Sequence, residues 1–280
     1  MLGAIIGDTV GSPFEFDQRK RLAQTQYPLF QFPAHFTDDT VMTVAIIEAI
    51  LNYQDDGEAL DEEKLAEYCK RSMIKWGRKY PLAGYGGRFG QWLWKKDPQP
   101  YQSYGNGSGM RVSPAGFLYD NLEDVLTAAK ATALPSHDHP EGIKGAQAIA
   151  YMIWAAKNKK SREEMKSEVE KRFGYDLNFT FDEIRPTYHM DETCMGSVPQ
   201  AIVAFLESES YEHCLRHAIS IGGDADTIAC MAGGIAEAYY GIPEEIRAEG
   251  MKHIPDEMHP IVEEAYLRVT EDPAMFEDDD

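Results

Sequence analysis

Apolar residues recur at spacings of three and four along most of this chain, and this helical period constrains the fold more than any other feature. After the stretch "FTDDT", the apolar positions are Val41, Ala45, Ile46, Ala49, Ile50 and Tyr53. Such spacing places the side chains on one face of a helix. Further helices are predicted over 61–79, 139–158, 161–173, 197–207, 210–220, 226–240, 243–253 and 257–270. The stretch "SREEMKSEVEKRFG" begins with a capping box, Ser161 and Glu164, and stops at Gly174.

Patterns typical of β-strands are scarce. Only "DLNFTF" (176–181) alternates, and it fits either a short strand or a loop. Two glycine-rich segments, 81–90 and 101–116, are expected to be irregular. No linker, composition shift or internal repeat divides the chain. We therefore predict an all-α protein, a compact orthogonal helical bundle, with one domain over 1–280 and an acidic tail over 271–280.

The charge of the chain excludes several classes of partner. Lys plus Arg number 27 and Asp plus Glu number 47, which gives a net charge of −20. A chain this acidic gains nothing from neutralising phosphates, so we expect neither nucleic acid nor an anionic membrane as a partner. An anionic substrate would need local help from metal ions or backbone amides.

The cysteines and the N-terminal stretch favour a cytoplasmic location. Cys69, Cys194, Cys214 and Cys230 are widely spaced and form no C-x-x-C pair, so neither a zinc site nor a disulfide framework is indicated. The first residues lack the basic region of a signal peptide, and Asp8 interrupts their apolar run. No apolar run approaches the roughly 18 residues that a membrane span needs.

Two short acidic motifs stand out as candidates for chemistry. They are "FTDDT", with Thr37, Asp38 and Asp39, and "GGDADT", with Asp224, Asp226 and Thr227. Each motif alone fits a helix N-cap. An EF-hand loop starting at Asp224 fails, since its sixth and twelfth positions hold Ala229 and Ile235. A D-x-D-x-[TV] phosphatase motif also fits poorly, because glycines rather than an apolar strand precede it.

Considered together, the two motifs indicate a metal site. Each supplies two carboxylates and a hydroxyl at the expected start of a helix, and Mg²⁺ and Mn²⁺ prefer oxygen ligands. Crowded carboxylates would repel by up to about 4 kcal/mol per close pair at an effective dielectric near 20. Bound cations would remove that penalty.

Three other stretches leave alternatives open. In "GDTVGSPFEF", Asp8 fits a buried group bonded to backbone and Glu15 fits a surface acid, while Gly3, Gly7 and Gly11 fit one face of a tightly packed helix. In "YGNGSGMRVSP", the glycines can let amides approach a diphosphate, but the spacing is not G-x-G-x-x-G. In "SHDHPEG", His137 and His139 fit either metal ligands or ordinary loop residues.

These pieces, in this order, resemble one family, the ADP-ribosylglycohydrolases or ADP-ribosylhydrolases. The matching motifs are "GAIIGDTVGSPFE", "FTDDT", "YGNGSGMR", "SHDHPEG" and "GGDADTIACMAGGIAEAYYG", which span residues 3 to 241. The resemblance implies an all-α fold with two Mg²⁺ or Mn²⁺ ions in a cleft. The implied metal ligands are Thr37, Asp38, Asp39, Asp224, Asp226 and Thr227. The implied substrate-binding residues are Asn106, Gly107, Ser108, Gly109 and His137; the family often has alanine in place of Gly109.

The reaction that this resemblance implies is hydrolysis of an N- or O-glycosidic bond between ADP-ribose and an acceptor. Its partner would be an ADP-ribosylated protein or a small-molecule conjugate. The carboxylates available for catalysis are Glu15, Asp38 and Asp226, and Glu15 matches an acidic residue that the family places near the metals. Two alternatives stay open: a metal-dependent phosphohydrolase acting on nucleotides or sugar phosphates, and a non-catalytic ADP-ribose-binding relative. Residues 76–104 either shape the leaving-group pocket or form a packed aromatic loop.

Overall fold

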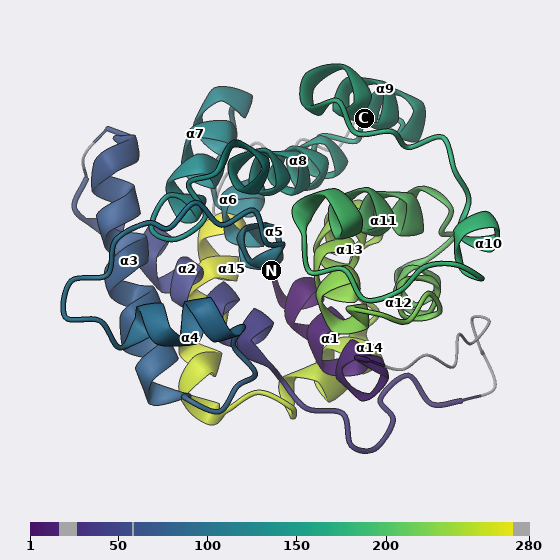
Figure 1. The fold of residues 1–280 in the computed structure, drawn as a ribbon, viewed down its shortest axis with the longest axis horizontal. Helices are drawn as coiled ribbons and strands as arrows, with labels where there is room; N and C mark the ends of the chain where they lie inside the picture. The colour runs from purple at the N-terminus through teal and green to yellow at the C-terminus, as the bar shows by residue number, and fades with distance from the viewer. Residues whose placement is uncertain (17–26, 58, 271–280) are drawn as a thin grey trace.

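A computed structural model describes residues 1–16, 27–57 and 59–270, and within them the chain is helical (Figure 1). The longer helices are α1 (Leu2–Gly11), α2 (Asp38–Asp55), α3 (Glu62–Lys79), α7 (Leu122–Ala133), α8 (Pro140–Lys157), α9 (Arg162–Phe173), α11 (Cys194–Leu206), α12 (Tyr211–Ile219), α13 (Ala225–Tyr240), α14 (Glu244–Met251) and α15 (His259–Thr270). The shorter ones are η1 (Ser12–Phe14), α4 (Gly87–Leu93), α5 (Gly107–Met110), α6 (Ser113–Leu118), α10 (Phe181–Ile184) and η2 (Asp256–Met258). The predicted acidic tail, 271–280, lies outside the described residues.

The all-α prediction is confirmed, and several local signals are confirmed with it. In α9 the side chain of Ser161 accepts from the backbone of Glu164, and the Glu164 side chain completes the capping box. The same helix ends at Gly174, whose φ of 68° is left-handed. Thr37 caps α2 and accepts from the backbone N–H of Asp39. In the described part of the chain, the β-structure is one isolated bridge, between Gly105 and Thr193.

Other elements differ from the prediction. The segments 81–90 and 101–116, expected to be irregular, contain α4, α5 and α6 or parts of them. The alternating stretch 176–181 is not a strand: it runs as a loop, and its last residue, Phe181, begins α10. Helix α7 was not predicted.

The buried helix α13 organises the core. It packs along α1 and also contacts α8, α11 and α12, as Figure 1 shows. The glycines of α1 allow this helix to lie so close to α13. A Cβ atom added at Gly7 would lie 2.1 Å from the carbonyl oxygen of Ala229, and one at Gly11 would lie 2.4 Å from the Cα of Asp226. The prediction that the glycines of α1 form one face of a tightly packed helix is therefore confirmed.

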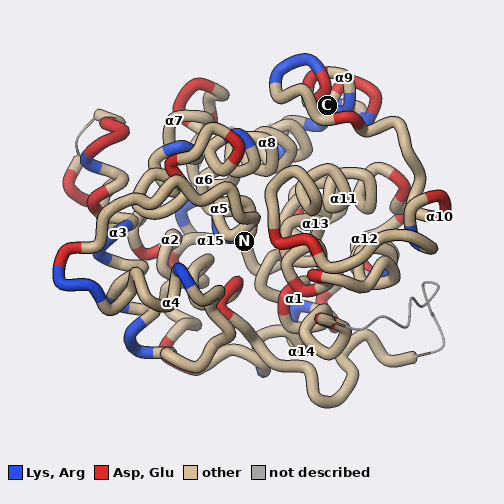
Figure 2. The backbone as a smooth tube through the Cα atoms, viewed as in Figure 1, with Lys and Arg blue, Asp and Glu red and all other residues tan. Residues whose placement is uncertain are grey.

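This packing brings three helix ends together. The last turn of α1 lies against the first turn of α13, and the start of α2 is bonded to Asp8 of α1. Figure 2 shows a group of acidic residues in the middle of the molecule, between α2 and α1. None of the described helices is long and apolar enough to cross a membrane.

Candidate metal centre

Asp8 joins α1 to the first turn of α2. Its carboxylate is fully buried and accepts from the backbone N–H groups of Thr37 and Thr40, at 2.8 and 3.1 Å. It also accepts from the hydroxyl groups of the same two threonines, at 2.7 and 2.5 Å. These four bonds satisfy donors at the start of the helix that would otherwise lack partners. The expectation that Asp8 is a buried group bonded to backbone is confirmed.

Two groups of carboxylates meet at Asp226. The first contains Asp8, Asp39 and Asp226, and the second contains Glu15, Asp224 and Asp226. Within each group, oxygen atoms of the three side chains lie within 4.8 Å of one another. The two motifs, almost two hundred residues apart in sequence, are therefore adjacent in space. No histidine takes part in either group.

The local backbone explains how Asp224 and Asp226 reach this position. Gly222 and Gly223 precede them with φ of 71° and 69°, a left-handed conformation that favours glycine. Asp226 then falls in the first turn of α13, which is buried from Ala225 to Glu237. The carbonyl of Gly223 also accepts from the N–H of Phe16, at 3.0 Å, and this bond holds the segment after η1 against the same loop.

The threonines of both motifs contact Asp39. Thr227 donates to Asp39 Oδ2 at 3.2 Å, and Thr37 Oγ1 lies 3.5 Å from the same oxygen. The other oxygen of Asp39, Oδ1, is buried and has no hydrogen-bond partner among the described residues. A buried carboxylate oxygen without a donor is costly in a protein alone and is suited to a cation.

The carboxylates of the centre hold protons more tightly than usual. Burial, reinforced by repulsion from neighbouring carboxylates, raises the pKa values of Asp38, Asp39 and Asp226 well above their ordinary range. Burial also raises the pKa of Asp224 to about 6, although a hydrogen bond from Asn106 favours its ionised form. Burial and the charges of Asp224 and Asp8 raise the pKa of Glu15 to about 7.

The glycine-rich loop borders the centre, but its residues face different ways. Asn106 donates from Nδ2 to Asp224 Oδ2 at 2.6 Å. Ser108 is fully buried and donates to the carbonyl of Gly142 at 2.7 Å. A Cβ at Gly109 would lie 2.8 Å from the sulfur of Met231, and one at Gly107 would lie 3.1 Å from His137 Nε2.

A cavity of about 250 Å³ opens beside the centre. Asp38 and Glu192 line it together with Arg88, Arg111 and His137. Its other lining residues are Gly86, Gly87, Phe89, Tyr101, Ser103, Gly105 and Gly107. Predicted residues and unpredicted ones thus share one cavity. Arg88, Tyr101 and Ser103 fall within 76–104, the segment suggested as a pocket wall, whereas Glu192 had no signal in the sequence.

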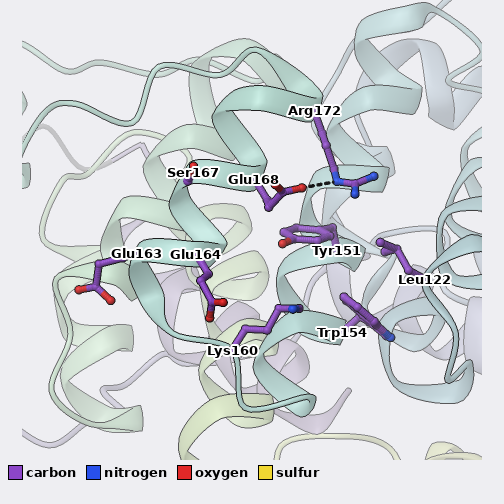
Figure 3. Close-up of a pocket in the computed structure, with 9 residues that line it drawn as sticks. All are labelled: Leu122, Tyr151, Trp154, Lys160, Glu163, Glu164, Ser167, Glu168 and Arg172. Carbon is purple, nitrogen blue, oxygen red and sulfur yellow. Dashed lines mark hydrogen bonds and ion pairs between the residues drawn. The ribbon is translucent and has the colours of Figure 1, made fainter.

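A second pocket lies away from the acidic centre, between α8 and α9 (Figure 3). It measures about 530 Å³ and is lined by Tyr151 and Trp154 on one side. Several of its charged side chains already have partners within α9. Arg172 pairs with Glu168 at 2.8 Å, and Glu164 belongs to the cap of α9. None of the residues predicted from the motifs lies there.

His139 has a structural role in this arrangement. Its Nδ1 accepts from the N–H of Glu141 at 3.1 Å and caps α8. Only His137 of the two faces the cavity beside the acidic centre.

Comparisons with known proteins agree on one family. The sequence model described as ADP-ribosylglycohydrolase matches residues 1–274. The chain is 28% identical to the ADP-ribosylhydrolase ARH3 of Mus musculus, over 87% of this chain and 83% of that protein. It is 26% identical to an uncharacterized protein of Archaeoglobus fulgidus, over 90% of each. A solved chain titled "ADP-ribosylglycohydrolase-related protein complex" has the same fold, with a TM-score of 0.64 at 24% identity and with 96% and 97% of the two chains covered.

Proposed function

Because this chain belongs to the ADP-ribosylglycohydrolase family, we propose that it is a metal-dependent hydrolase that releases ADP-ribose from an N- or O-linked acceptor. The observation that carries the proposal is the pair of carboxylate groups sharing Asp226, next to a cavity that both carboxylates and arginines line. The acceptor would be a protein side chain or a small molecule.

The residues of the centre fit two divalent cations, Mg²⁺ or Mn²⁺. We assign Thr37, Asp38, Asp39, Asp224, Asp226 and Thr227 as the ligands. The unpartnered oxygen of Asp39 and the two carboxylate groups that converge on Asp226 support this assignment for Asp39, Asp224 and Asp226. Asp38 belongs to neither group, and its assignment rests on the family resemblance. Asp8 is close enough to be a ligand, but both of its oxygens already accept from Thr37 and Thr40, so we assign it the positioning of α2. When bound, the ions would stabilise negative charge on ribose oxygens and lower the pKa of a water molecule.

Glu15 is the best-placed carboxylate for moving a proton. It is half-buried and belongs to the same group as Asp224 and Asp226. In the protein without metal its pKa of about 7 lies close to neutral pH, and an effective acid or base needs a pKa near the operating pH. Asp38 and Asp226 are the other candidates for this role.

The cavity suits an anionic nucleotide-like group despite the charge of the whole chain. Arg88 and Arg111 supply positive charge to its lining, and glycines of the loop line the same space. The ribose to be cleaved would then lie toward Asp38. The residues that select the leaving group would lie near Asp38, with Glu192, which lines the same cavity, among them.

The proposal is tested by incubating the protein with a panel of conjugates, including ADP-ribosyl-arginine, ADP-ribosyl-serine and O-acetyl-ADP-ribose, in the presence of Mg²⁺ or Mn²⁺. We expect free ADP-ribose and intact acceptor from at least one of them, identified by mass. Asp226→Asn should abolish turnover while the circular dichroism spectrum stays helical. Release of inorganic phosphate would instead favour a phosphohydrolase, and tight binding of ADP-ribose with no turnover would favour a non-catalytic relative.

A further inference from the structure

A chain of buried hydrogen bonds leads from Arg111 to the cavity. The guanidinium group of Arg111 donates from Nε and Nη2 to the carbonyl of Thr132, at 3.2 and 2.9 Å. Nη2 also donates to Ser136 Oγ at 3.0 Å. Ser136 Oγ in turn lies 2.8 Å from Nδ1 of His137. Arg111 and Ser136 are almost fully buried, and His137 is 5% exposed.

The direction of these bonds follows from the donors available. Arginine has no acceptor, so Ser136 must accept from Arg111. The single hydroxyl hydrogen of Ser136 then needs another acceptor, and within the described residues Nδ1 of His137 is the one in reach. If Nδ1 carried the proton, that hydroxyl hydrogen would be buried without a partner, which is unfavourable. The network therefore assigns Nδ1 as the acceptor.

A neutral imidazole that accepts at Nδ1 carries its proton on Nε2. Burial keeps the His137 ring neutral by holding its pKa well below the ordinary value, and the charges of Arg111 and Arg88 add to this effect. Nε2 has no hydrogen-bond partner among the described residues. It faces the glycine loop, where a Cβ at Gly107 would lie 3.1 Å from it and one at Gly105 would lie 3.5 Å from it.

Arg88 lines the same cavity and places a positive charge near His137. Its guanidinium group lies 4.7 Å from the centre of the Tyr101 ring and donates to the Tyr101 carbonyl at 2.9 Å. No carboxylate pairs with Arg88 in the part of the chain that the structure describes. The Tyr101 ring also lies beside His137, with ring centres 6.2 Å apart. An N–H donor next to two guanidinium groups matches the oxygen of a phosphate.

We propose that Arg111 and Ser136 fix His137, which the family resemblance already implies as a substrate-binding residue, in the tautomer with its proton on Nε2, and that this tautomer presents the N–H, beside Arg88, to a phosphate oxygen of the ADP-ribosyl group. His137 and Arg88 are then binding residues, and Arg111 and Ser136 are positioning residues. The inference rests on the proposed function only for the identity of the ligand. The tautomer is a property of the free protein.

The first experiment measures the tautomer directly. Nitrogen NMR of ¹⁵N-histidine-labelled free protein distinguishes the protonated ring nitrogen, and the His137 signals are those lost in His137→Gln among the eight histidines. We expect the proton on Nε2 in the wild type and a shift toward Nδ1 in Ser136→Ala. The buried Ser208, which donates to Phe205 at 2.6 Å, gives a matched control, Ser208→Ala, with no effect on His137. A proton on Nδ1 in the wild type would overturn the inference.

The second experiment tests what the N–H binds. In His137→Gln the side-chain amide reaches the position of Nε2, whereas in His137→Asn it reaches that of Nδ1. Calorimetry with ADP-ribose should show Asn weakening binding at least about tenfold more than Gln, a difference of about 1.4 kcal/mol. Adenosine, which lacks phosphate, should not distinguish the two variants. Equal losses for Gln and Asn, or equal losses for both ligands, would overturn the inference.

These readouts separate this inference from the proposed function. Normal ADP-ribose binding with the expected tautomer, but without hydrolysis of any conjugate, would contradict the proposed hydrolase and leave the role of Ser136 and His137 standing. Hydrolysis that is unaffected in His137→Asn would contradict the binding role of His137 and leave the proposed hydrolase standing.

Discussion

Asp226 is the residue on which the account depends most, because both carboxylate groups include it. It is buried in the first turn of α13, where the helix N-terminus supplies some positive potential. Burial, and after it repulsion from Asp39 and Asp224, nevertheless raises the Asp226 pKa well above its ordinary range. The centre is therefore unfavourable as a set of ionised carboxylates until cations join it.

This unfavourable charge predicts how stability depends on pH. The pKa values of Asp224 and Glu15, about 6 and about 7, exceed those of unfolded carboxylates, which are about 4. Between those limits the folded protein holds more protons than the unfolded chain. Its stability in the absence of metal should fall as pH rises from about 4 to about 7. Bound cations keep the ligand carboxylates, Asp224 among them, ionised, so the stabilisation by Mn²⁺ should grow over the same window.

Thermal unfolding with and without Mn²⁺ at pH 5 and pH 7.5 checks this expectation. The increase in Tm caused by Mn²⁺ should be clearly larger at pH 7.5 than at pH 5. Asp226→Asn should lose most of that increase at both values. An equal shift at both values, or a larger one at pH 5, would be inconsistent with a centre whose carboxylates bind the metal.

At the level of single residues, the motifs predicted which carboxylates to consider but not how they are arranged. Asp39 and Asp226 were paired from their motifs and from the resemblance, and the structure places them in one group. Their roles as ligands stay predictions. Arg88 was foreseen only as part of the segment 76–104, and Glu192 was not foreseen, because neither residue belongs to a motif and only the fold brings them to one cavity. Asn106 contacts Asp224 rather than lining the cavity, a detail that side-chain direction alone decides.

At the level of elements, the contact of α1 with α13 fixes the geometry of the centre. Gly7 lies where a Cβ would come 2.1 Å from a backbone oxygen of α13, and backbone cannot move as cheaply as a flexible side chain. Gly7→Ala should therefore push α13 away from α1. We expect a loss of about 3 kcal/mol in the free energy of unfolding and a much weaker response to Mn²⁺.

Urea denaturation of Gly7→Ala measures this effect, and α4 supplies the matched control. At Gly90 the nearest atom to an added Cβ is 3.8 Å away, so Gly90→Ala should change stability by less than about 1 kcal/mol. A Gly7→Ala variant as stable as the wild type would show that α1 and α13 are not tightly coupled.

The elements also show where sequence patterns succeed. Long helices such as α2 and α3 were predicted because many turns repeat the same period. The helices α5 and α6 have four and six residues, too few to establish a period, and glycines dominate the first of them. In α7 the alanines at 128, 129, 131 and 133 are buried but contrast weakly with polar neighbours. The 176–181 stretch alternates, yet a strand needs a partner and no strand lies beside it among the described residues.

At the level of the whole molecule, charge and function must be reconciled. The chain carries −20, yet the proposed substrate is an anion. The cavity resolves this locally, because Arg88 and Arg111 line it and, in our proposal, two divalent cations bind beside it. The all-α architecture was predictable from periodicity because most of the long helices obey it. The single-domain organisation stays a prediction, as does the selection of the acceptor, since loops far apart in sequence form that surface.

The central claim is that hydrolysis requires metal ions held by the carboxylates around Asp226. The most direct measurement adds Mn²⁺ stepwise to protein freed of metal and follows ADP-ribose release from the conjugate cleaved fastest in the panel. We predict no release without metal, a rise that levels off near two ions per chain, and no release from Asp226→Asn at any concentration. Full activity in excess chelator would contradict the account.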